Sequence, residues 1–323
     1  MRLFKTTALA GAALLALAVP ALAQGSSAAN WPNQMVRIVV PFSAGSVTDT
    51  LARIMTDKLA EIWKQQVIVE NRPGLPGTTS VAKGQADGYT LMLTSNGHTI
   101  AKTINKNISF DPVADFAGVT KIASVPMVAV VPPDLPAKNL AEFIALAKEK
   151  PGKLNFSSAG LASTTFLSAE VLKQAAKIDV QHVPYKGTPE ATTAVIRGDS
   201  QLYFTPIPLA QELTAGNKVR AIAINSGTRS DQMPDIPTVK ETVPSYDYDS
   251  WFAVLVPAGT PKDVIAKVSR DMATVLKMPD VIEKLKQQGA VPAPTSPEAL
   301  DAQIKREVEL YAKLLQEAGV AAK

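Results

Sequence analysis

The sequence lacks cysteine altogether and has only two histidines among its 323 residues. The chain therefore has no disulfide, no thiolate nucleophile and no Cys-ligated zinc or iron–sulfur site, and two histidines leave little room for a multi-histidine metal site. We accordingly expect neither a metal nor a cofactor. The enzyme signatures G-x-S-x-G, G-x-x-x-x-G-K-[ST], G-x-G-x-x-G and H-E-x-x-H are also missing. These absences disfavour many catalytic mechanisms.

Strong charge of either sign is absent as well. The formal net charge is +4 and no cluster of lysine and arginine stands out, so a nucleic-acid partner is not expected. Beyond the first 23 residues, no stretch stays apolar for the roughly 20 residues that a membrane helix needs. The content of 46% hydrophobic and 19% charged residues is that of a globular protein, and the length predicts two domains with sizeable cores.

Residues 1–23 have the pattern of an export signal. Two basic residues precede an apolar run over 8–19, and the small-x-small sequence Ala-Leu-Ala follows at 21–23. We predict cleavage before Gln24 and a flexible leader over 24–30. The alternative of an uncleaved membrane anchor is disfavoured, because the apolar run is too short to span a bilayer comfortably. Since no cysteine is present to carry a lipid, the expected location is the bacterial periplasm, without a membrane anchor.

From residue 31 onward, segments with the patterns of strands and helices alternate. Residues Leu51, Ile54, Met55, Leu59 and Ile62 recur at helical spacing. A turn-rich loop over 71–77 and a short helix before Gly88 are also expected. Predicted strands cover 36–40, 67–69, 89–94, 126–131, 154–157, 180–183, 201–204, 219–224 and 249–256, and further helices cover 139–150, about 188–197, about 207–215 and three C-terminal segments. Such repeated units predict an α/β fold with parallel sheets covered by helices.

Two loops of small residues, each following a predicted strand and opening a helix, are candidate anion sites. Sheets of this class bind ligands beyond the carboxyl ends of their strands, where helix N-termini present free N–H groups and a partial positive charge. In the loop over 41–49, Gly45 allows close backbone approach, and Ser46 and Thr48 offer hydroxyls. The loop over 157–165 has the same chemistry. From the pattern alone, an ordinary role as turn and N-cap residues is favoured.

Other candidates are single residues. His98 follows a strand and could line a cleft as a hydrogen-bond donor, although a lone histidine is more often structural. Tyr185 comes at the carboxyl end of a strand and could cover a ligand. For Asp49 we expect hydrogen bonds to backbone N–H groups of its own helix, because a bare carboxylate facing an anion would oppose binding. His182 and Trp251 are expected to serve structure.

Ordered motifs along the chain carry a family resemblance. They are WPNQMVRIVVPFSAGSVTD (31–49), VIVENRPG (67–74), ADGYTL (86–91), FDPVADF (110–116), KPGKLNFSSAG (150–160), HVPYKG (182–187), DIPTV (235–239) and WFAVLVPAGTP (251–261). Over 31–320 the chain resembles the Bug-type solute receptors, the periplasmic substrate-binding proteins of tripartite tricarboxylate transporters. The resemblance implies a two-domain Venus-flytrap fold of the type II periplasmic binding protein class. Its first domain would combine 31–130 with 250–323 and its second would cover 131–249, with crossovers near Val130 and Asp249.

The resemblance further implies that the first loop (42–49) and the second loop (158–165) hold a small carboxylate between the domains. Backbone N–H groups near 44–46 and 160–163 would do much of the binding. The predicted ligand site comprises Phe42, Ala44, Gly45, Ser46, Thr48, His98, Ser158, Gly160, Ser163, Thr164, Tyr185 and Thr205. The implied partner is the membrane permease of such a transporter, and the receptor is expected to be a monomer.

The sequence departs from the family pattern at two places. The family loop usually has two adjacent glycines, whereas here the second is Ser46. After Leu202 the family often has Phe-Asp-Asn, whereas here Thr205 takes the place of the aspartate. Because threonine cannot pair with an ammonium group, we predict a ligand without one. The preferred candidate is an aliphatic dicarboxylate of four to six carbons, with aromatic carboxylates and citrate left open.

Two alternative functions remain at this point. The same fold could present its carboxylate to a sensor kinase rather than to a permease. Less favoured is a secreted α/β enzyme that acts on a small anionic substrate with His98 as its base, since nothing in the sequence marks a nucleophile.

Overall fold

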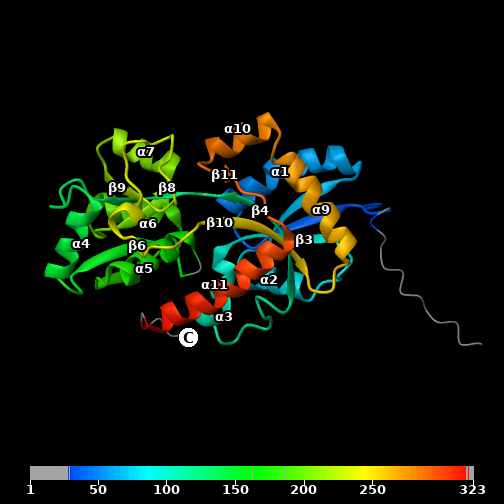
Figure 1. Cartoon of the computed structure of the whole chain (residues 1–323), viewed down its shortest axis with the longest axis horizontal. Coiled ribbons are helices and arrows are strands. Elements are labelled where there is room, and N and C mark those ends of the chain that lie inside the picture. Colours follow the sequence, from blue (N-terminus) through cyan, green and yellow to red (C-terminus); the bar gives the residue numbers. More distant parts are fainter. Residues whose placement is uncertain (1–27, 29, 162, 186, 318, 320–323) are drawn as a thin grey trace, which may run out of the picture.

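A computed structural model describes residues 28, 30–161, 163–185, 187–317 and 319. The predicted export signal and most of the predicted leader lie outside the described residues. Two lobes of sheet and helix lie side by side along the long axis of the molecule, and Figure 1 shows the chain segments that run between them. None of the helices in the described part of the chain combines the length and apolarity needed to cross a bilayer.

The first lobe is built on a six-stranded sheet in the order β11-β4-β10-β3-β1-β2. Its strands are β1 (Val36–Val40), β2 (Val67–Asn71), β3 (Thr90–Ser95), β4 (Phe116–Ser124), β10 (Trp251–Pro257) and β11 (Val291–Pro292). β1 pairs in parallel with β2 and β3, but β10 pairs antiparallel with β3 and β4, and β11 antiparallel with β4. The expected parallel pairing is present among β1, β2 and β3 but not in the rest of the sheet, because β10 brings the returning chain through the sheet in the opposite direction.

Helices cover both faces of this sheet. The side chains of neighbouring strand residues point to opposite faces, so Ile38 joins one apolar cluster and Val39 another. The first cluster is covered by α1 (Val47–Trp63), α9 (Lys262–Val275) and α10 (Pro279–Gln287), and the second by α2 (Leu75–Ala82) and α11 (Pro297–Glu317). Two short helices, η1 (Asn96–Ile100) and α3 (Ala101–Ile104), follow β3.

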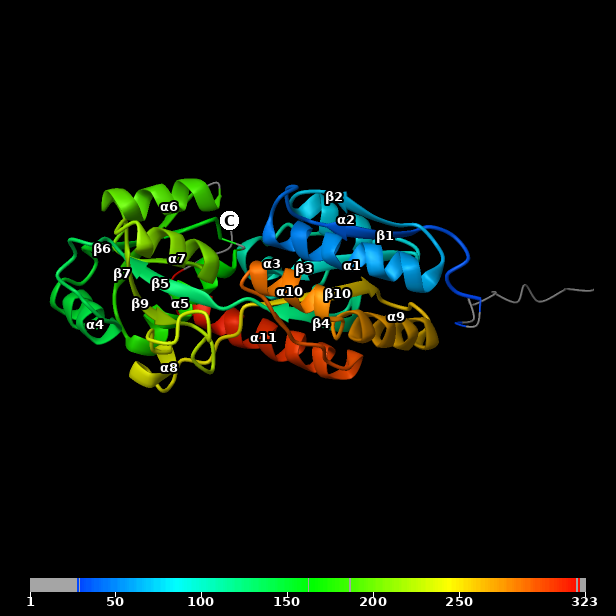
Figure 2. The same cartoon turned by 90° about the horizontal axis from the view of Figure 1, so that it is seen from above.

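The second lobe has a smaller mixed sheet. Its strands are β5 (Met127–Val131), β6 (Leu154–Ser158), β7 (Val180–Pro184), β8 (Tyr203–Pro206) and β9 (Arg220–Ile224). β5 lies between β8 and β9 and is antiparallel to both, β6 is parallel to β7, and a parallel bridge from Phe156 to Leu202 joins the two sets. As Figure 2 shows, α6 (Thr188–Arg197) and α7 (Ile207–Ala215) lie on one side of the sheet, and α4 (Leu140–Glu149), α5 (Thr164–Ala176) and α8 (Val239–Thr242) on the other.

The chain passes from one lobe to the other twice, once between Ser124 and Met127 and once before Trp251. The second change falls at the predicted crossover near Asp249. The first precedes the crossover predicted near Val130, because β5, which contains that residue, pairs with β8 and β9.

Several elements differ from the sequence prediction. The strands β4 and β11, the helix α8 and the two short helices after β3 were not expected. α2 begins inside the loop predicted over 71–77, because Pro76 occupies the first turn of the helix, where a missing N–H is harmless.

Candidate functional site

The topology brings the two candidate loops to facing edges of the lobes. β1, β3 and β4 run in the same direction, so the carboxyl end of β1 lies at the edge where β4 leaves for the second lobe. In the second lobe, β6 is parallel to β8 and β8 antiparallel to β5, so the carboxyl end of β6 lies at the edge where β5 enters. The loops that follow β1 and β6 therefore both open toward the neighbouring lobe.

The first loop joins β1 to α1 and is shaped by its own hydrogen bonds. Ser46 is the N-cap of α1: its Oγ accepts from the Asp49 N–H at 3.2 Å, and its own N–H donates to the Ser43 carbonyl. Gly45 has φ +80°, which residues with a side chain rarely adopt. Ser46 has φ −69° and ψ 160°, which any residue adopts, so a serine in place of the family's second glycine causes no backbone strain.

Asp49 holds this loop in place. Its carboxylate accepts from the Gly45 N–H at 2.8 Å and from Asn71 Nδ2 at 3.0 Å, and it pairs with Arg53 at 3.0 Å. Burial raises the pKa of Asp49, but the bonds from Arg53, Gly45 and Asn71 outweigh it, so the pKa lies below its usual value. As expected, Asp49 accepts a hydrogen bond from a backbone N–H, although that N–H belongs to Gly45 of the loop rather than to the helix.

The second loop joins β6 to α5 and is built in the same way. Ser163 is the N-cap of α5, with its Oγ accepting from the Phe166 N–H at 3.1 Å. Ser158 Oγ lies 2.7 Å from His182 Nε2 and accepts from the Gly160 N–H at 3.1 Å. Gly160 has φ +114°, again a conformation that favours glycine. Burial lowers the pKa of His182 to about 4, so its ring is neutral near pH 7.

The first turns of α1 and α5 leave backbone donors unused. Within the described part of the chain, the N–H groups of Val47 and Thr48 on α1 have no hydrogen-bond partner, and neither do those of Thr164 and Thr165 on α5. Such groups carry the partial positive charge of a helix N-terminus. Each of the two facing loops therefore offers a pair of donors suited to one carboxylate.

These donors lie further along the chain than the sequence suggested. The expected N–H groups of Gly45 and Ser46 already donate to Asp49 and Ser43, and that of Gly160 donates to Ser158. The reason is local, because small polar side chains in a turn bind the nearest backbone groups first.

Most predicted site residues lie on these loops, but Tyr185, His98 and Thr205 do not. Ala44 and Gly45 are exposed, Phe42 and Ser46 are half-buried, and Thr48 is buried at the start of α1. Tyr185 is half-buried and adjoins the second loop, because its N–H donates to the Ser158 carbonyl at 2.9 Å. His98 and Thr205 are placed differently from the rest.

His98 is only 5% exposed, in η1 behind the first loop. Its Nε2 lies 2.9 Å from the Pro112 carbonyl, to which it can only donate, and its ring packs edge-on against Phe116 at 4.8 Å between ring centroids. Burial lowers the pKa of His98 to about 4, so near pH 7 the ring carries one proton, on Nε2. The expected donor role is not available to this ring, since Nδ1 is then an acceptor.

Thr205 is fully buried on β8, on the same side as Tyr203 and under α6. The hydroxyls of Thr205, Tyr203 and Thr192 have no hydrogen-bond partner among the described residues. Burial raises the pKa of Tyr203, and the nearby hydroxyls of Thr188, Thr192 and Thr205 offset this only in part, none of them meeting the phenol in hydrogen-bond geometry. Thr205 thus points into the lobe rather than toward its surface.

Comparison with known proteins identifies the family. Residues 51–320 match the family described as "Tripartite tricarboxylate transporter family receptor". The chain belongs to this family. BugT of Bordetella pertussis is 31% identical to the receptor over 313 residues, which cover 95% of this chain and 96% of BugT. The resemblance to Bug-type receptors is therefore confirmed.

Solved structures share the fold of the receptor. A protein of R. palustris solved with adipate superposes with a TM-score of 0.79 at 31% identity, covering 91% of this chain and 100% of that one. MatC from Rhodopseudomonas palustris, solved with bound malate, gives a TM-score of 0.75 at 29% identity, covering 88% and 100%. The predicted two-domain α/β fold of periplasmic binding proteins is confirmed. The receptor is a solute-binding protein and not an enzyme.

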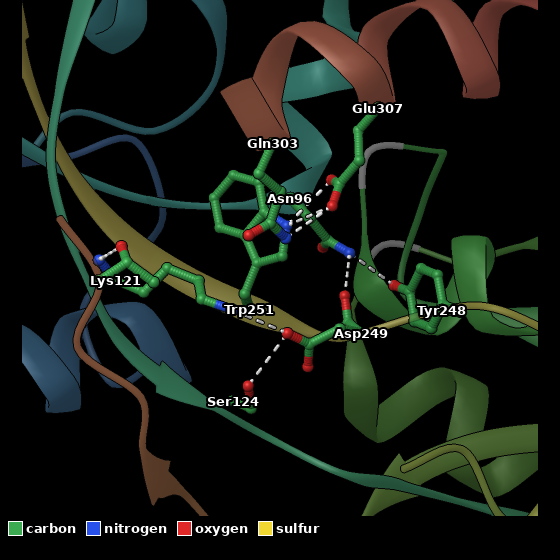
Figure 3. Close-up of polar contacts among 9 residues, drawn as sticks. Asn96, Lys121, Ser124, Tyr248, Asp249, Trp251, Gln303 and Glu307 are labelled. Atoms are coloured by element: carbon green, nitrogen blue, oxygen red, sulfur yellow. Dashed lines mark hydrogen bonds and ion pairs between the residues drawn. The ribbon is translucent and has the colours of Figure 1, made fainter. Parts of the chain in front are cut away.

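A chain of hydrogen bonds that the sequence did not suggest joins the lobes of the receptor, and Figure 3 shows its part around Asn96, Tyr248 and Asp249. Asn96 Nδ2 on η1 donates to the Tyr248 hydroxyl at 2.9 Å and to the Asp249 carbonyl at 3.1 Å. The Tyr248 hydroxyl donates in turn to the carbonyl of Thr164, the first residue of α5, at 3.1 Å. These partners are more than 80 positions apart, so no local pattern could have indicated them.

Further contacts fix the returning linker to the first lobe. Asp249 Oδ2 lies 3.1 Å from both Lys121 Nζ and Ser124 Oγ on β4. Trp251, the first residue of β10, donates its Nε1–H to the carboxyl oxygens of Glu307 on α11 at 2.9 and 3.1 Å. The linker is thus held by β4 and by α11.

A cavity of about 720 Å³ lies at the linkers of the receptor but away from the two loops. It is lined by residues that follow β9, by α10 and by the start of β11, together with linker residues 124, 126 and 247–250. β9 and β11 flank β5 and β4 on the side opposite to β8 and β10. The free donors of α1 and α5 belong to the other side, so size alone does not make this cavity the carboxylate site.

Proposed function

We propose that the receptor captures a small carboxylate between its lobes and delivers it to a membrane permease of a tripartite tricarboxylate transporter. The observation that carries this proposal is the pair of unused N–H groups on each of two helix N-termini at facing edges of the lobes. Neither pair neutralises a dianion alone, whereas both together bind its two ends. Ligand contacts from both lobes favour a closed form, with motion about the two linkers.

For the ligand we propose an aliphatic dicarboxylate of four to six carbons without an amino group. Two similar proteins, solved with adipate and with malate, support this class. The absence of an acidic residue at position 205 supports a ligand that lacks an ammonium group. Because Thr205 is buried, it does not contact the ligand. The preference for a ligand without an ammonium group therefore comes from the absence of a negative charge at position 205.

The test removes one donor without disturbing the helix. In Val47→Pro the N–H at the first position of α1 is lost, and proline fits there because Ser46 already has the extended conformation that a residue before proline needs. Isothermal titration with succinate, adipate and malate should show binding weakened roughly ten- to hundredfold, the effect of losing a hydrogen bond to a charged group.

Val47→Ala is the matched control, because it shortens the same side chain and keeps the N–H. Its affinities should stay close to those of the original receptor. Equal losses in both variants would argue against carboxylate binding at α1. Tighter binding of aspartate or glutamate than of every dicarboxylate without an amino group would instead disprove the inference from Thr205.

We also propose that the chain is exported and cleaved before Gln24. The observations behind this are the basic start, the apolar run and the Ala-Leu-Ala sequence of residues 1–23. The intact mass of the protein recovered from the periplasm should correspond to a chain that begins at Gln24. A mass that includes residues 1–23 would contradict it.

A further inference from the structure

The cavity of about 720 Å³ at the linkers, called the linker cavity below, has walls from both lobes. They are formed by residues 282, 286 and 290–292 of the first lobe, 225–232 of the second, and linker residues 124, 126 and 247–250. In Figure 1, α10 and β11 lie at the end of the first lobe nearest to the second. The width of the linker cavity therefore depends on the angle between the lobes.

The two lobes touch at the border of this cavity. Gly289 follows α10 closely and has φ +68°. A Cβ atom at this position would lie 2.7 Å from Pro208 Cδ on α7 of the second lobe, which is too close for any side chain. This contact places the carboxyl end of α10, and with it Lys286, beside the second lobe.

Movement about the linkers changes the two sides of the molecule in opposite ways. The linker cavity lies on the side of β9 and β11, whereas the unused N–H groups of α1 and α5 lie on the other side of the linkers. A hinge rotation that brings these N–H groups together around a ligand moves the walls of the linker cavity apart. Opening of the lobes brings the same walls together.

Opposite charges line this cavity on its two walls. Asp231 is exposed on the wall that the second lobe forms, and Lys286 is exposed on α10 of the first lobe. Neither side chain has an ion-pair or hydrogen-bond partner among the residues that the structure describes. Each charge is therefore available to the other when the walls approach.

The other charged groups of the cavity are paired or lie on a linker. Arg229 pairs with Glu241 at 2.6 Å, and Asp249 pairs with Lys121 at 3.1 Å. Asp247 belongs to the linker itself, close to the axis of rotation, so its position changes less with the angle between the lobes. The two unpaired charges on the opposite walls are thus the ones whose separation follows this angle.

We propose that Asp231 and Lys286 form an ion pair across the linker cavity when the lobes open, and that this pair stabilises the open form of the receptor. The inference rests on the proposed function, because the open form is the one that admits and releases the ligand. An exposed ion pair shifts an equilibrium by roughly two- to fivefold. The pair therefore favours return to the open form and makes the carboxylate affinity lower by a similar factor.

Charge reversal tests this pair. Asp231→Lys and Lys286→Asp each place like charges on the two walls, so both variants should favour the closed form. Each should bind adipate roughly two- to fivefold more tightly in isothermal titration at low salt, and small-angle scattering without ligand should give a smaller radius of gyration. The double variant restores opposite charges, and both values should return to those of the original receptor.

The two single variants change the net charge of the receptor in opposite directions. A general attraction for an anionic ligand would therefore strengthen binding in one and weaken it in the other, whereas loss of the ion pair strengthens binding in both. The differences should shrink in 1 M sodium chloride, where charges are screened beyond roughly 3 Å.

Asp235→Lys and Lys284→Asp are the matched controls, because these residues are exposed near the same positions in the chain and do not line the cavity. Their radii without ligand should equal that of the original receptor. Unchanged radii in both test variants, affinities that move in opposite directions, or a double variant unlike the original would overturn the ion pair. Failure of every carboxylate to bind the original receptor would overturn the proposed function, and the ligand-free radii would still decide whether the pair forms.

Discussion

Among single residues, Glu307 is the most unusual ionisable group. It is 5% exposed on α11, and its carboxyl accepts hydrogen bonds from Trp251 Nε1 and Gln303 Nε2. Burial raises the pKa of Glu307 to about 7, against the lowering effect of those two bonds, and Asp249 raises it further. Between the ordinary glutamate pKa and about 7, the folded chain therefore holds a proton that the unfolded chain has lost.

This proton predicts a specific pH dependence. Since the folded pKa is raised, the contribution of Glu307 to stability is fully present below the unfolded pKa and is lost as the pH rises toward 7. Glu307→Gln should raise the free energy of unfolding at pH 8 by roughly 1–3 kcal/mol and change it little at pH 4. Urea unfolding at both pH values measures this difference.

Glu309→Gln on the same helix is the control, because that side chain is exposed and the substitution removes the same charge. It should leave the free energy of unfolding nearly unchanged at both pH values. A Glu307→Gln variant that is destabilised at pH 8 would show that the carboxylate is bound more favourably than its burial indicates.

Thr205 gives a second prediction at this scale. Its hydroxyl is buried without a partner, so Thr205→Val replaces an unsatisfied polar group with a methyl group of similar shape. Thermal unfolding should show a stability equal to or up to about 1 kcal/mol above the original, and titration should show unchanged carboxylate affinity. A loss of affinity with unchanged stability would instead place Thr205 in contact with the ligand.

Residues also differ in how far sequence could predict their roles. Ser46 and Ser163 cap helices through N–H groups three positions away, so the local pattern of small polar residues was enough to predict their N-cap role. The direction in which the Thr205 side chain points depends on which face of β8 is covered by α6. Which ring nitrogen of His98 carries the proton depends on the Pro112 carbonyl. Both are set by tertiary contacts that no local pattern contains.

At the scale of elements, the first loop depends on one carboxylate. Asp49→Asn would present an amide N–H to the Gly45, Asn71 and Arg53 groups, which are themselves donors. We expect the free energy of unfolding to fall by roughly 1–3 kcal/mol and carboxylate binding to weaken, because α1 would start from a less ordered loop. Urea unfolding and isothermal titration measure the two effects.

Asp57→Asn serves as the comparison, since it removes the same charge from an exposed position on the same helix. Only Asp49→Asn should lose both stability and affinity. Similar results for the two variants would mean that net charge, and not the shape of the loop, matters for binding.

Helices and strands were predictable where their apolar residues recur at a single regular spacing. The strands β1 and β9 and the helices α6 and α7 lie within a residue or so of their predicted ranges, because apolar spacing marks them. β4 went unrecognised because its sequence FAGVTKIAS has a glycine and small residues instead of clear alternation. The antiparallel pairing of β10 could not be predicted, because it depends on the path of the chain between lobes.

For the whole molecule, the family resemblance predicted two lobes but not what links them. The Tyr248 hydroxyl accepts from Asn96 in the first lobe and donates to the Thr164 carbonyl in the second. Thr164 is also one of the residues whose N–H is free for a ligand. The same first turn of α5 is thus tied to the opposite lobe and poised to bind a carboxylate.

Tyr248→Phe keeps the buried ring and removes both bonds. The cost to the free energy of unfolding should be only about 1 kcal/mol, because Asn96 keeps the Asp249 carbonyl and Thr164 keeps the Ser168 hydroxyl as partners. The larger effect should be on the arrangement of the lobes: with this link gone, closed forms are less populated and the carboxylate Kd rises in proportion. Small-angle scattering should show a larger radius of gyration without ligand and convergence with the original receptor at saturating adipate.

Tyr246→Phe separates this effect from a general loss of hydrogen bonding. The Tyr246 hydroxyl donates to the Ser168 carbonyl within the second lobe, so its removal costs stability without touching the first lobe. Its radius of gyration and Kd should remain those of the original receptor. If both variants expand alike, or neither does, the Tyr248 bonds do not control the spacing of the lobes, and closure must be governed by the ligand contacts of α1 and α5 alone.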